Sequence, residues 1–196
     1  ERGLTVKDIS LFVAAIYFGG MILQYPIGWI SDRMDRRVLI FIVCTLGAIF
    51  SFSANLSDNF LWLLIVAFVI GGVSNPLYSL YIAYANDYLD HDDMASASGG
   101  LIFLTGVGAI FGPSIVGWLL NVYGAESYFL FVGVVMTIMA GYALYRMTQT
   151  SSMSVEETST YAPVTPASTP IAMEFAQEYA IELALEEEDQ SNNENN

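Results

Sequence analysis

Charged side chains are scarce in this sequence. Asp, Glu, Lys and Arg make up 13% of the 196 residues, about half the share that a soluble domain usually carries. Basic residues are the scarcest, with six Lys and Arg against 20 Asp and Glu, and none of the six lies beyond Arg146. The net charge of −14 is therefore mostly a property of residues 147–196. No basic surface is available for nucleic acid, which is not an expected partner.

Cysteine and histidine are almost absent. The one cysteine, Cys44, lies inside an apolar stretch, which excludes a disulfide framework and favours a small buried side chain. The one histidine, His91, lies among four aspartates. This spacing favours a solvated loop, with an aspartate that caps the next helix, over a metal site. Since a nucleophile–base pair and a phosphate-binding glycine loop are also lacking, we expect no enzyme, no metal and no cofactor.

Long apolar stretches are what the sequence has instead, since hydrophobic residues make up 55% of it. Five such stretches follow one another, each close to or above the roughly 20 residues that a helix needs to cross a bilayer. Strands and buried helices of soluble proteins are seldom so long. We therefore predict an all-α fold, a polytopic membrane helical bundle over residues 1–146. The expected helices cover about 9–30, 38–54, 60–84, 94–122 and 127–145.

A charged turn, Gly28–Arg37, separates the first two apolar stretches. It holds three arginines, whereas the stretches on either side of it carry no charge. Arginines clustered at the end of a membrane helix mark the cytoplasmic side. Alternation of the helices then places Arg146 and a cytoplasmic C-terminus on the same side, and residues 1–8 on the other. Four of the six basic residues then lie on the cytoplasmic side and two on the other side, which agrees with this orientation.

The polar side chains of this turn are expected to find partners nearby. Asp32 should accept hydrogen bonds from backbone N–H groups at a helix start, where the helix dipole favours an anion. The arginines should pair with acids at neighbouring cytoplasmic helix ends, and Asp87 and Asp90 are the nearest by topology. Such ion pairs would hold one conformation and break in another. The alternative is that the arginines only set the topology.

Small and polar residues interrupt the apolar helices at regular intervals. Gly20, Gln24 and Gly28 recur every four residues in the first helix, a stripe that lets another helix approach closely. Polar side chains of the first and third helices are expected to line a substrate pathway, and Ser74, Tyr78 and Tyr81 of the third fall within a narrow arc. The alternative is that the tyrosines form the aromatic belt at the membrane surface. The pathway candidates are Tyr17, Gln24, Ser74, Asn75, Tyr78 and Tyr81.

The pattern Gly28-x-x-x-Asp32-Arg33-x-x-Arg36-Arg37 resembles the signature loop of the major facilitator superfamily, secondary transporters with twelve helices in two halves. In that family the loop joins the second and third helices of each half. The resemblance implies that the residues of this pattern form a gating motif. It also implies that the chain holds five of the six helices of one half.

A second pattern, Gly108-x-x-x-Gly112-Pro113-x-x-x-Gly117, resembles a motif in the fifth helix of a half in drug–proton antiporters of that family. Close helix packing is the alternative meaning of such glycines. In the first pattern, Asp35 stands where the family usually has glycine. Together the resemblances imply a secondary active transporter that moves a small solute by alternating access in the bacterial inner (plasma) membrane. Its partners would be the lipid bilayer, a small-molecule substrate and the missing N-terminal half of the same protein.

Residues 147–196 form an acidic tail that differs in composition from the rest. Residues 147–168, rich in Ser, Thr and Pro, are predicted to be disordered. Thr169 and Pro170 suit a helix start, and a short helix is expected over 170–188. The tail resembles a true C-terminus, which assigns the chain to the C-terminal half; a shortened central loop is the alternative. A rival function is a non-transporting scaffold or regulatory subunit that recruits a partner through this tail.

Overall fold

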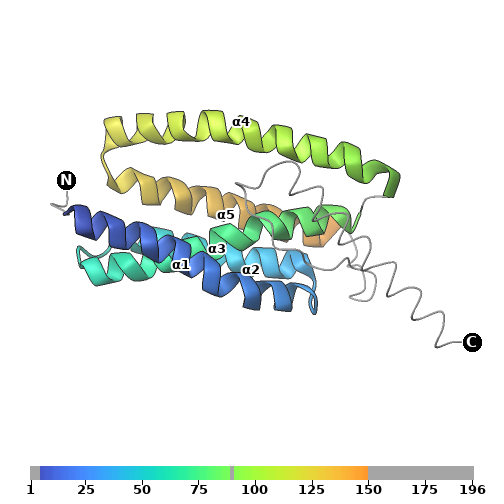
Figure 1. The fold of residues 1–196 in the computed structure, drawn as a ribbon, viewed down its shortest axis with the longest axis horizontal. Helices are drawn as coiled ribbons and strands as arrows, with labels where there is room; N and C mark the ends of the chain where they lie inside the picture. The colour runs from blue at the N-terminus through green and yellow to red at the C-terminus, as the bar shows by residue number, and fades with distance from the viewer. Residues whose placement is uncertain (1–4, 89–90, 150–196) are drawn as a thin grey trace, which may run out of the picture.

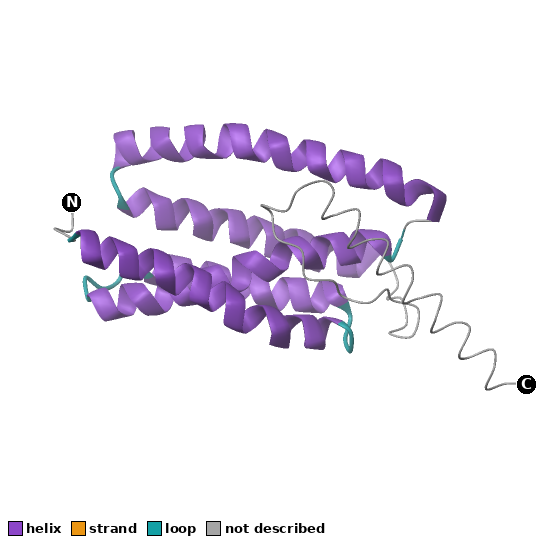
Figure 2. Cartoon of the chain, viewed as in Figure 1, coloured by secondary structure: helices purple, strands orange, loops and turns teal. Residues whose placement is uncertain are grey.

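The structure is a computed structural model that describes residues 5–88 and 91–149. Over these residues it contains five α-helices and no strand (Figure 2), which confirms the predicted all-α fold class. All five helices are long and apolar enough to cross a membrane. In chain order they are α1 (Val6–Ser31), α2 (Arg36–Ser53), α3 (Phe60–Asn86), α4 (His91–Tyr123) and α5 (Glu126–Gln149) (Figure 1). The disorder and the helix expected in the tail fall on 150–196, outside the described residues.

The helices α1, α2, α4 and α5 begin one to three residues earlier than the apolar stretches predict, and polar residues cap the first two. Thr5 and Asp8 form a capping box at the start of α1, with the Thr5 N–H donating to the Asp8 carboxylate at 2.9 Å. Asp35 caps α2 by accepting from the N–H of Arg37 at 2.9 Å, so α2 already begins at Arg36. The apolar pattern marks the part of a helix that suits hydrocarbon, and the caps lie beyond that part.

The closest helix pair is α1 with α3, which pack along each other through glycines. A Cβ on Gly19 would lie 1.9 Å from the carbonyl oxygen of Phe68, and a Cβ on Gly71 would lie 2.0 Å from that of Ile16. Beside them, a Cβ on Gly20 would lie 2.0 Å from the Asn75 amide nitrogen. The backbones are therefore in direct contact, as small residues allow in membranes. This confirms the close helix approach predicted at the Gly20 position.

The main core lies where α2 packs between α3 and α5. Cys44 is fully buried at its centre, as predicted, and its sulfur lies 3.9 Å from the Tyr81 hydroxyl. The apolar side chains of this core are contributed by all three helices, so α2 holds α3 and α5 together. Its buried members are Leu39, Ile40, Val43, Cys44, Ala48, Val73, Leu77, Leu80, Met136, Ala140 and Ala143.

The helix α4 stands apart from the others along most of its length (Figure 1). It turns back to α5 at Gly124, which adopts a positive φ of 84° that favours glycine. No residue from 99 to 123 is buried. Its main packing against α3 is a small cluster of Ile82 with Leu101 and Ile102. One long face of α4 is thus uncovered by the described part of the chain.

Candidate gating site at the Gly28–Arg37 turn

The turn between α1 and α2 is closed at each side by an aspartate. Asp32 is the C-terminal cap of α1, and its N–H donates to the carbonyl of Gly28 at 3.2 Å. Asp35 is the N-terminal cap of α2. The predicted role of Asp32 at a helix start is therefore filled within this chain by Asp35. The difference arises because α2 begins at Arg36 and has its cap at position 35, which leaves Asp32 three residues too early to cap it.

Arg36 is the buried centre of the site. Its side chain is 1% exposed and forms an ion pair with Asp87, which is 4% exposed, at the end of α3. The guanidinium also donates to the carbonyl of Ala83 at 3.0 Å and to the hydroxyl of Ser31 at 3.2 Å. A second carboxylate, Asp32, lies 3.8 Å away and is one-third exposed. Hydrogen bonds between charged groups in such a setting are about twice as strong as neutral ones.

This geometry confirms the predicted pairing of the turn with Asp87. Asp90, the other predicted partner, is outside the described residues. Two further acceptors, Ser31 and the Ala83 carbonyl, were not predicted. The Ala83 carbonyl is within reach because the last turn of α3 lies against the first turn of α2, and Ser31 is within reach because it ends α1, five residues before Arg36 across the turn.

Arg37 is bound within the turn itself. Two of its guanidinium nitrogens donate to the two oxygens of Asp35, at 3.0 and 2.7 Å, and its side chain is 5% exposed. Such a two-point contact fixes both the position and the orientation of a guanidinium. Neighbouring arginines of the turn thus have different carboxylate partners, Asp87 for Arg36 and Asp35 for Arg37.

Arg33 differs from both, since it lies on the surface. Its guanidinium stands 4.1 Å from the centre of the Trp29 ring and donates to the Trp29 carbonyl at 3.0 Å. An exposed contact between a cation and an aromatic ring contributes about 0.5–1 kcal/mol. Trp29 is itself half exposed, and a tryptophan beside an arginine suits the interfacial region of a membrane. The three arginines of the motif therefore have three distinct surroundings.

A fourth arginine, Arg146 near the end of α5, lies at the same end of the bundle. Arg146 donates to the hydroxyl of Tyr84 at 3.2 and 3.3 Å, and the Tyr84 ring packs edge-on against Tyr88 with 5.2 Å between ring centres. Tyr84 lies in the last turn of α3, and Asp87 and Tyr88 follow the helix directly, Asp87 as its C-terminal cap. The ends of α2, α3 and α5 are thus connected by polar contacts at one end of the bundle.

The pKa of Asp35 leads to a prediction about acid. Burial raises the pKa of this carboxyl, but the hydrogen bonds from Arg37 outweigh burial and hold it below its ordinary value of 3.8. A lowered pKa stabilises the folded state above pH 3.8, and the stabilisation is lost as the pH falls through the lowered value. We expect the difference in melting temperature between wild type and Asp35→Asn to stay constant from pH 7 to 5 and to shrink below pH 3.8. A difference that grows in acid would contradict the Arg37 contact.

The pathway candidates do not share one face. Asn75 contacts α1 at Gly20, Tyr78 packs beside Ile82 and the residues of α4, and Tyr81 points into the core against Cys44. Tyr78 and Tyr81 of the predicted arc thus face different neighbouring helices, because residues three apart on a helix already differ by about 60° in direction. Gln24 and Ser74 are half-buried, and Tyr17 is 71% exposed. Substrate contact by these residues stays a prediction.

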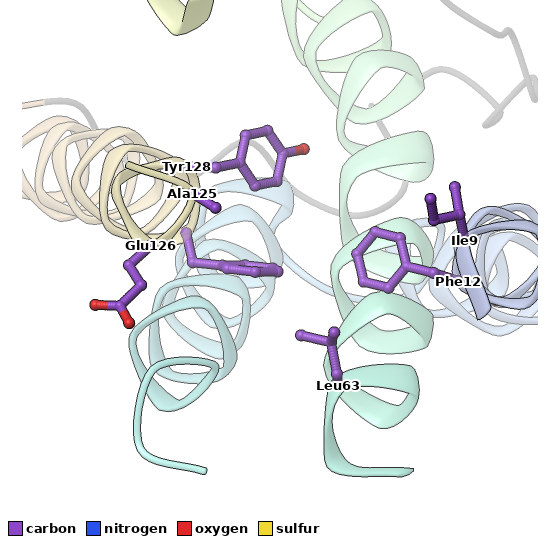
Figure 3. A pocket seen from close by; sticks show the side chains of 7 residues that line it. Ile9, Phe12, Leu63, Ala125, Glu126 and Tyr128 are labelled. Carbon is purple, nitrogen blue, oxygen red and sulfur yellow. The ribbon is translucent and has the colours of Figure 1, made fainter. Parts of the chain in front are cut away.

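A cavity lies at the opposite end of the bundle from the arginines. It has a volume of about 270 Å³ between the first turns of α1, α3 and α5, with Phe12 and Phe129 edge to face across it (Figure 3). Its walls are apolar apart from Tyr128 and Glu126, and the Glu126 carboxylate is turned away from Phe12 (Figure 3). None of the pathway candidates lines it.

Five helices of this length and apolar character define an integral membrane protein. At one end of the bundle a buried ion pair holds the charged turn. The chain matches the model of the Major Facilitator Superfamily over residues 1–179, and it belongs to this family. The family assignment, which rested on two short patterns, thus extends over most of the chain.

Curated relatives are bacterial and carry the same family in their names. The chain is 26% identical over 131 residues to the uncharacterized MFS-type transporter YfkF of Bacillus subtilis, covering 66% of this chain and 33% of the relative. It is also 26% identical over 139 residues to the uncharacterized MFS-type transporter YcaD of Salmonella arizonae and of Escherichia coli, covering 69% of this chain and 35% of each relative. The chain spans about a third of the length of the curated relatives it matches.

Proposed function

We propose that this chain is the C-terminal half of a secondary transporter that moves a small solute across the bacterial inner membrane by alternating access. The observation that carries the proposal is the buried ion pair between Arg36 and Asp87 in the family's signature turn. A buried ion pair adds little net stability to a fold, because the cost of desolvating the two charges offsets most of their attraction. Such a pair suits a conformational switch, because it holds the helix ends together in one state and its two charges become hydrated when the ends separate.

In the proposed cycle, the polar end of the bundle closes one side of the transport pathway. The Arg36–Asp87 pair holds the start of α2 against the end of α3 while this side is closed. Asp32, which is one-third exposed, lies at the edge of the site, where it is placed to bind a helix start of the N-terminal half. Opening to this side would separate these contacts and expose the pathway.

The substrate is proposed to bind jointly to this chain and the missing half. Tyr17 is largely exposed here, as a side chain that faces a pathway shared with another bundle would be. Gln24 and Asn75 lie along the α1–α3 contact and would supply hydrogen bonds at mid-membrane depth. The glycines of α4, with nothing of the described chain near them, are proposed to pack against a helix of the missing half. The proposed transport involves no covalent chemistry and no cofactor.

The orientation follows from the basic residues. Arg146 at the end of α5 contacts Tyr84 beside the signature turn, which supports placing all four of these arginines at one membrane surface. Lys7 lies at the start of α1, and hence toward the other end of the bundle. The positive-inside rule then favours a cytoplasmic signature turn and a cytoplasmic C-terminus.

Flux measurements on the full-length protein test this function. We expect Asp32→Asn to lower gradient-driven uptake or export, measured in proteoliposomes against a panel of solutes, by about tenfold, because the variant loses the negative charge that the positive end of a helix dipole attracts, although its amide can still accept a hydrogen bond there. Membrane insertion should be unchanged. Deletion of 147–196 is the matched control and should leave most of the flux. If no solute moves and the tail instead retains one specific protein, the scaffold function would replace this proposal.

A further inference from the structure

Two buried oxygen atoms near the end of α2 have no hydrogen-bond partner among the described residues. They are the hydroxyl oxygen of Ser51 and the side-chain carbonyl oxygen of Asn55. Ser51 is 0% exposed, and the Asn55 Oδ1 atom is buried within a half-buried residue. Since most buried polar atoms of folded proteins are hydrogen-bonded, two such oxygens close together indicate a site for a small polar ligand.

The Ser51 hydroxyl differs from hydroxyls elsewhere in the apolar helices. Thr45 of α2, Thr105 of α4 and Thr137 of α5 each donate to the backbone carbonyl four residues earlier, at 2.7 to 2.8 Å. This local hydrogen bond satisfies a hydroxyl within a helix without any partner from outside. Ser51 does not form it, so its hydroxyl is available to a ligand.

The Asn55 amide is held in one orientation. Its Nδ2 group donates to the backbone carbonyl of Glu126, at the start of α5, at 3.1 Å. Because a carbonyl only accepts, the nitrogen and not the oxygen of the amide must face Glu126. The buried Oδ1 atom is therefore an acceptor with a fixed position.

Ser51 and Asn55 lie four residues apart on one side of α2. Ala54, directly before Asn55, still has helical backbone angles, with φ −57° and ψ −30°. Side chains four residues apart on a helix are neighbours, with about 5–6 Å between their Cβ atoms. One water molecule spans such a gap with a hydrogen bond of about 2.8 Å to each oxygen. Around it, Ala48 and Ala54 are buried members of the two apolar clusters that α2 forms with α3 and α5.

We propose that Ser51 and Asn55 together bind one buried water molecule, which connects the end of α2 to the start of α5. The water donates to Asn55 Oδ1 and forms its second hydrogen bond with the Ser51 hydroxyl, and Asn55 Nδ2 extends the connection to Glu126. Buried waters in proteins typically make two to four such bonds. Two neutral oxygens are too few for a metal ion of the calcium or magnesium kind, which takes about six or more oxygen ligands. The site lies at the end of the bundle opposite the arginines, and it does not depend on the proposed function.

Four forms of the full-length protein test the inference: wild type, Ser51→Ala, Asn55→Ala and the double variant. The equilibrium constant for unfolding is measured in mixed micelles by circular dichroism. We expect Ser51→Ala to raise this constant about tenfold, because the water and the buried Asn55 Oδ1 atom lose a partner. In the Asn55→Ala background the same substitution should raise it less than about threefold, since the shared site is already lost.

Thr45→Ala is the matched control, because the Thr45 hydroxyl is bonded within its own helix. Its effect should be the same with and without Asn55→Ala. A Ser51→Ala protein that is as stable as wild type, or more stable, would overturn the inference, because removing a hydroxyl that has no ligand relieves a buried polar group. Equal effects of Ser51→Ala in both backgrounds would overturn it too, since the two residues would then share no ligand.

A second measurement distinguishes a bound water from a direct contact between the two side chains. It is an experimental density map of the wild-type protein, resolved well enough to show ordered water. We expect a peak within about 3.2 Å of both Ser51 Oγ and Asn55 Oδ1. Ordered water elsewhere in the map but none at this site, or a direct hydrogen bond between the two side chains, would overturn the inference. Because this test needs only the wild-type protein, it decides the question even if Asn55→Ala fails to fold.

Discussion

Replacing Asp87 with alanine is expected to lower the free energy of unfolding by about 3–5 kcal/mol, the cost of removing one partner from a buried ion pair. The substitution leaves the Arg36 guanidinium, which is 1% exposed, without the carboxylate that neutralises it. Asp32, at 3.8 Å, is a weaker replacement because it is partly solvated. Reversible unfolding of the full-length protein in mixed micelles, followed by circular dichroism over a denaturing-detergent titration, measures the change.

Two further variants sharpen this result. Glu126→Gln neutralises an exposed acid in the first turn of α5 and should alter the unfolding free energy by no more than about 1 kcal/mol. The double variant Arg36→Leu with Asp87→Leu should recover most of the loss, because no buried charge remains, while its flux stays low. An Asp87→Ala protein as stable as wild type would mean that the ion pair does not form in the resting protein.

Replacing Gly71 with alanine is expected to have the second large effect, on the α1–α3 pair. The added Cβ would lie 2.0 Å from the backbone oxygen of Ile16, an atom that cannot turn aside as a side chain can. The two helices must therefore separate, which costs about 1–3 kcal/mol for an overpacked contact and more where backbones touch. We expect a drop of about 2–12 °C in the detergent melting temperature, measured by thermal aggregation of the full-length protein.

Gly141→Ala is the matched control for the α1–α3 contact. Gly141 also lies inside a long apolar helix, α5, but nothing of the described chain comes within 4 Å of an added Cβ. Alanine favours a helix interior over glycine by up to about 1 kcal/mol, so this variant should be as stable as wild type or slightly more so. Equal losses in both variants would show that glycine itself, and not the close backbone contact, is required at these positions.

The sequence predicted the elements well and their arrangement less well. Apolar stretches near bilayer length determine where helices lie, since no other structure satisfies the backbone in lipid. Helix starts at Val6 and Arg36 were missed because caps are polar and lie outside the apolar signal. The signature turn could be predicted because charge between apolar stretches is conspicuous, and its pairing with Asp87 followed from topology alone.

The parts that could not be predicted depend on which helices pack together. The direction of the Tyr78 and Tyr81 side chains depends on α2 and α4, which a helical arc on α3 does not locate. The contact of Arg146 with Tyr84 joins residues 62 positions apart, beyond the reach of any local pattern. The glycines of α4 were expected to pack closely, but within the described chain they face no neighbour. The proposed function assigns their partner to the missing half.

The pairing of α1 with α3 has a consequence for how the protein is made. α1 ends at Ser31 and α3 at Asn86, so the ribosome completes the partner of α1 about 55 residues after α1 itself. At roughly 5–20 residues per second, this interval lasts about 3 to 11 s. During this time the Gly19–Gly20 surface lacks its contact with α3. Until then α1 is retained in the membrane without this contact, and a slow step in the synthesis of α3 prolongs the exposure of α1 to proteolysis.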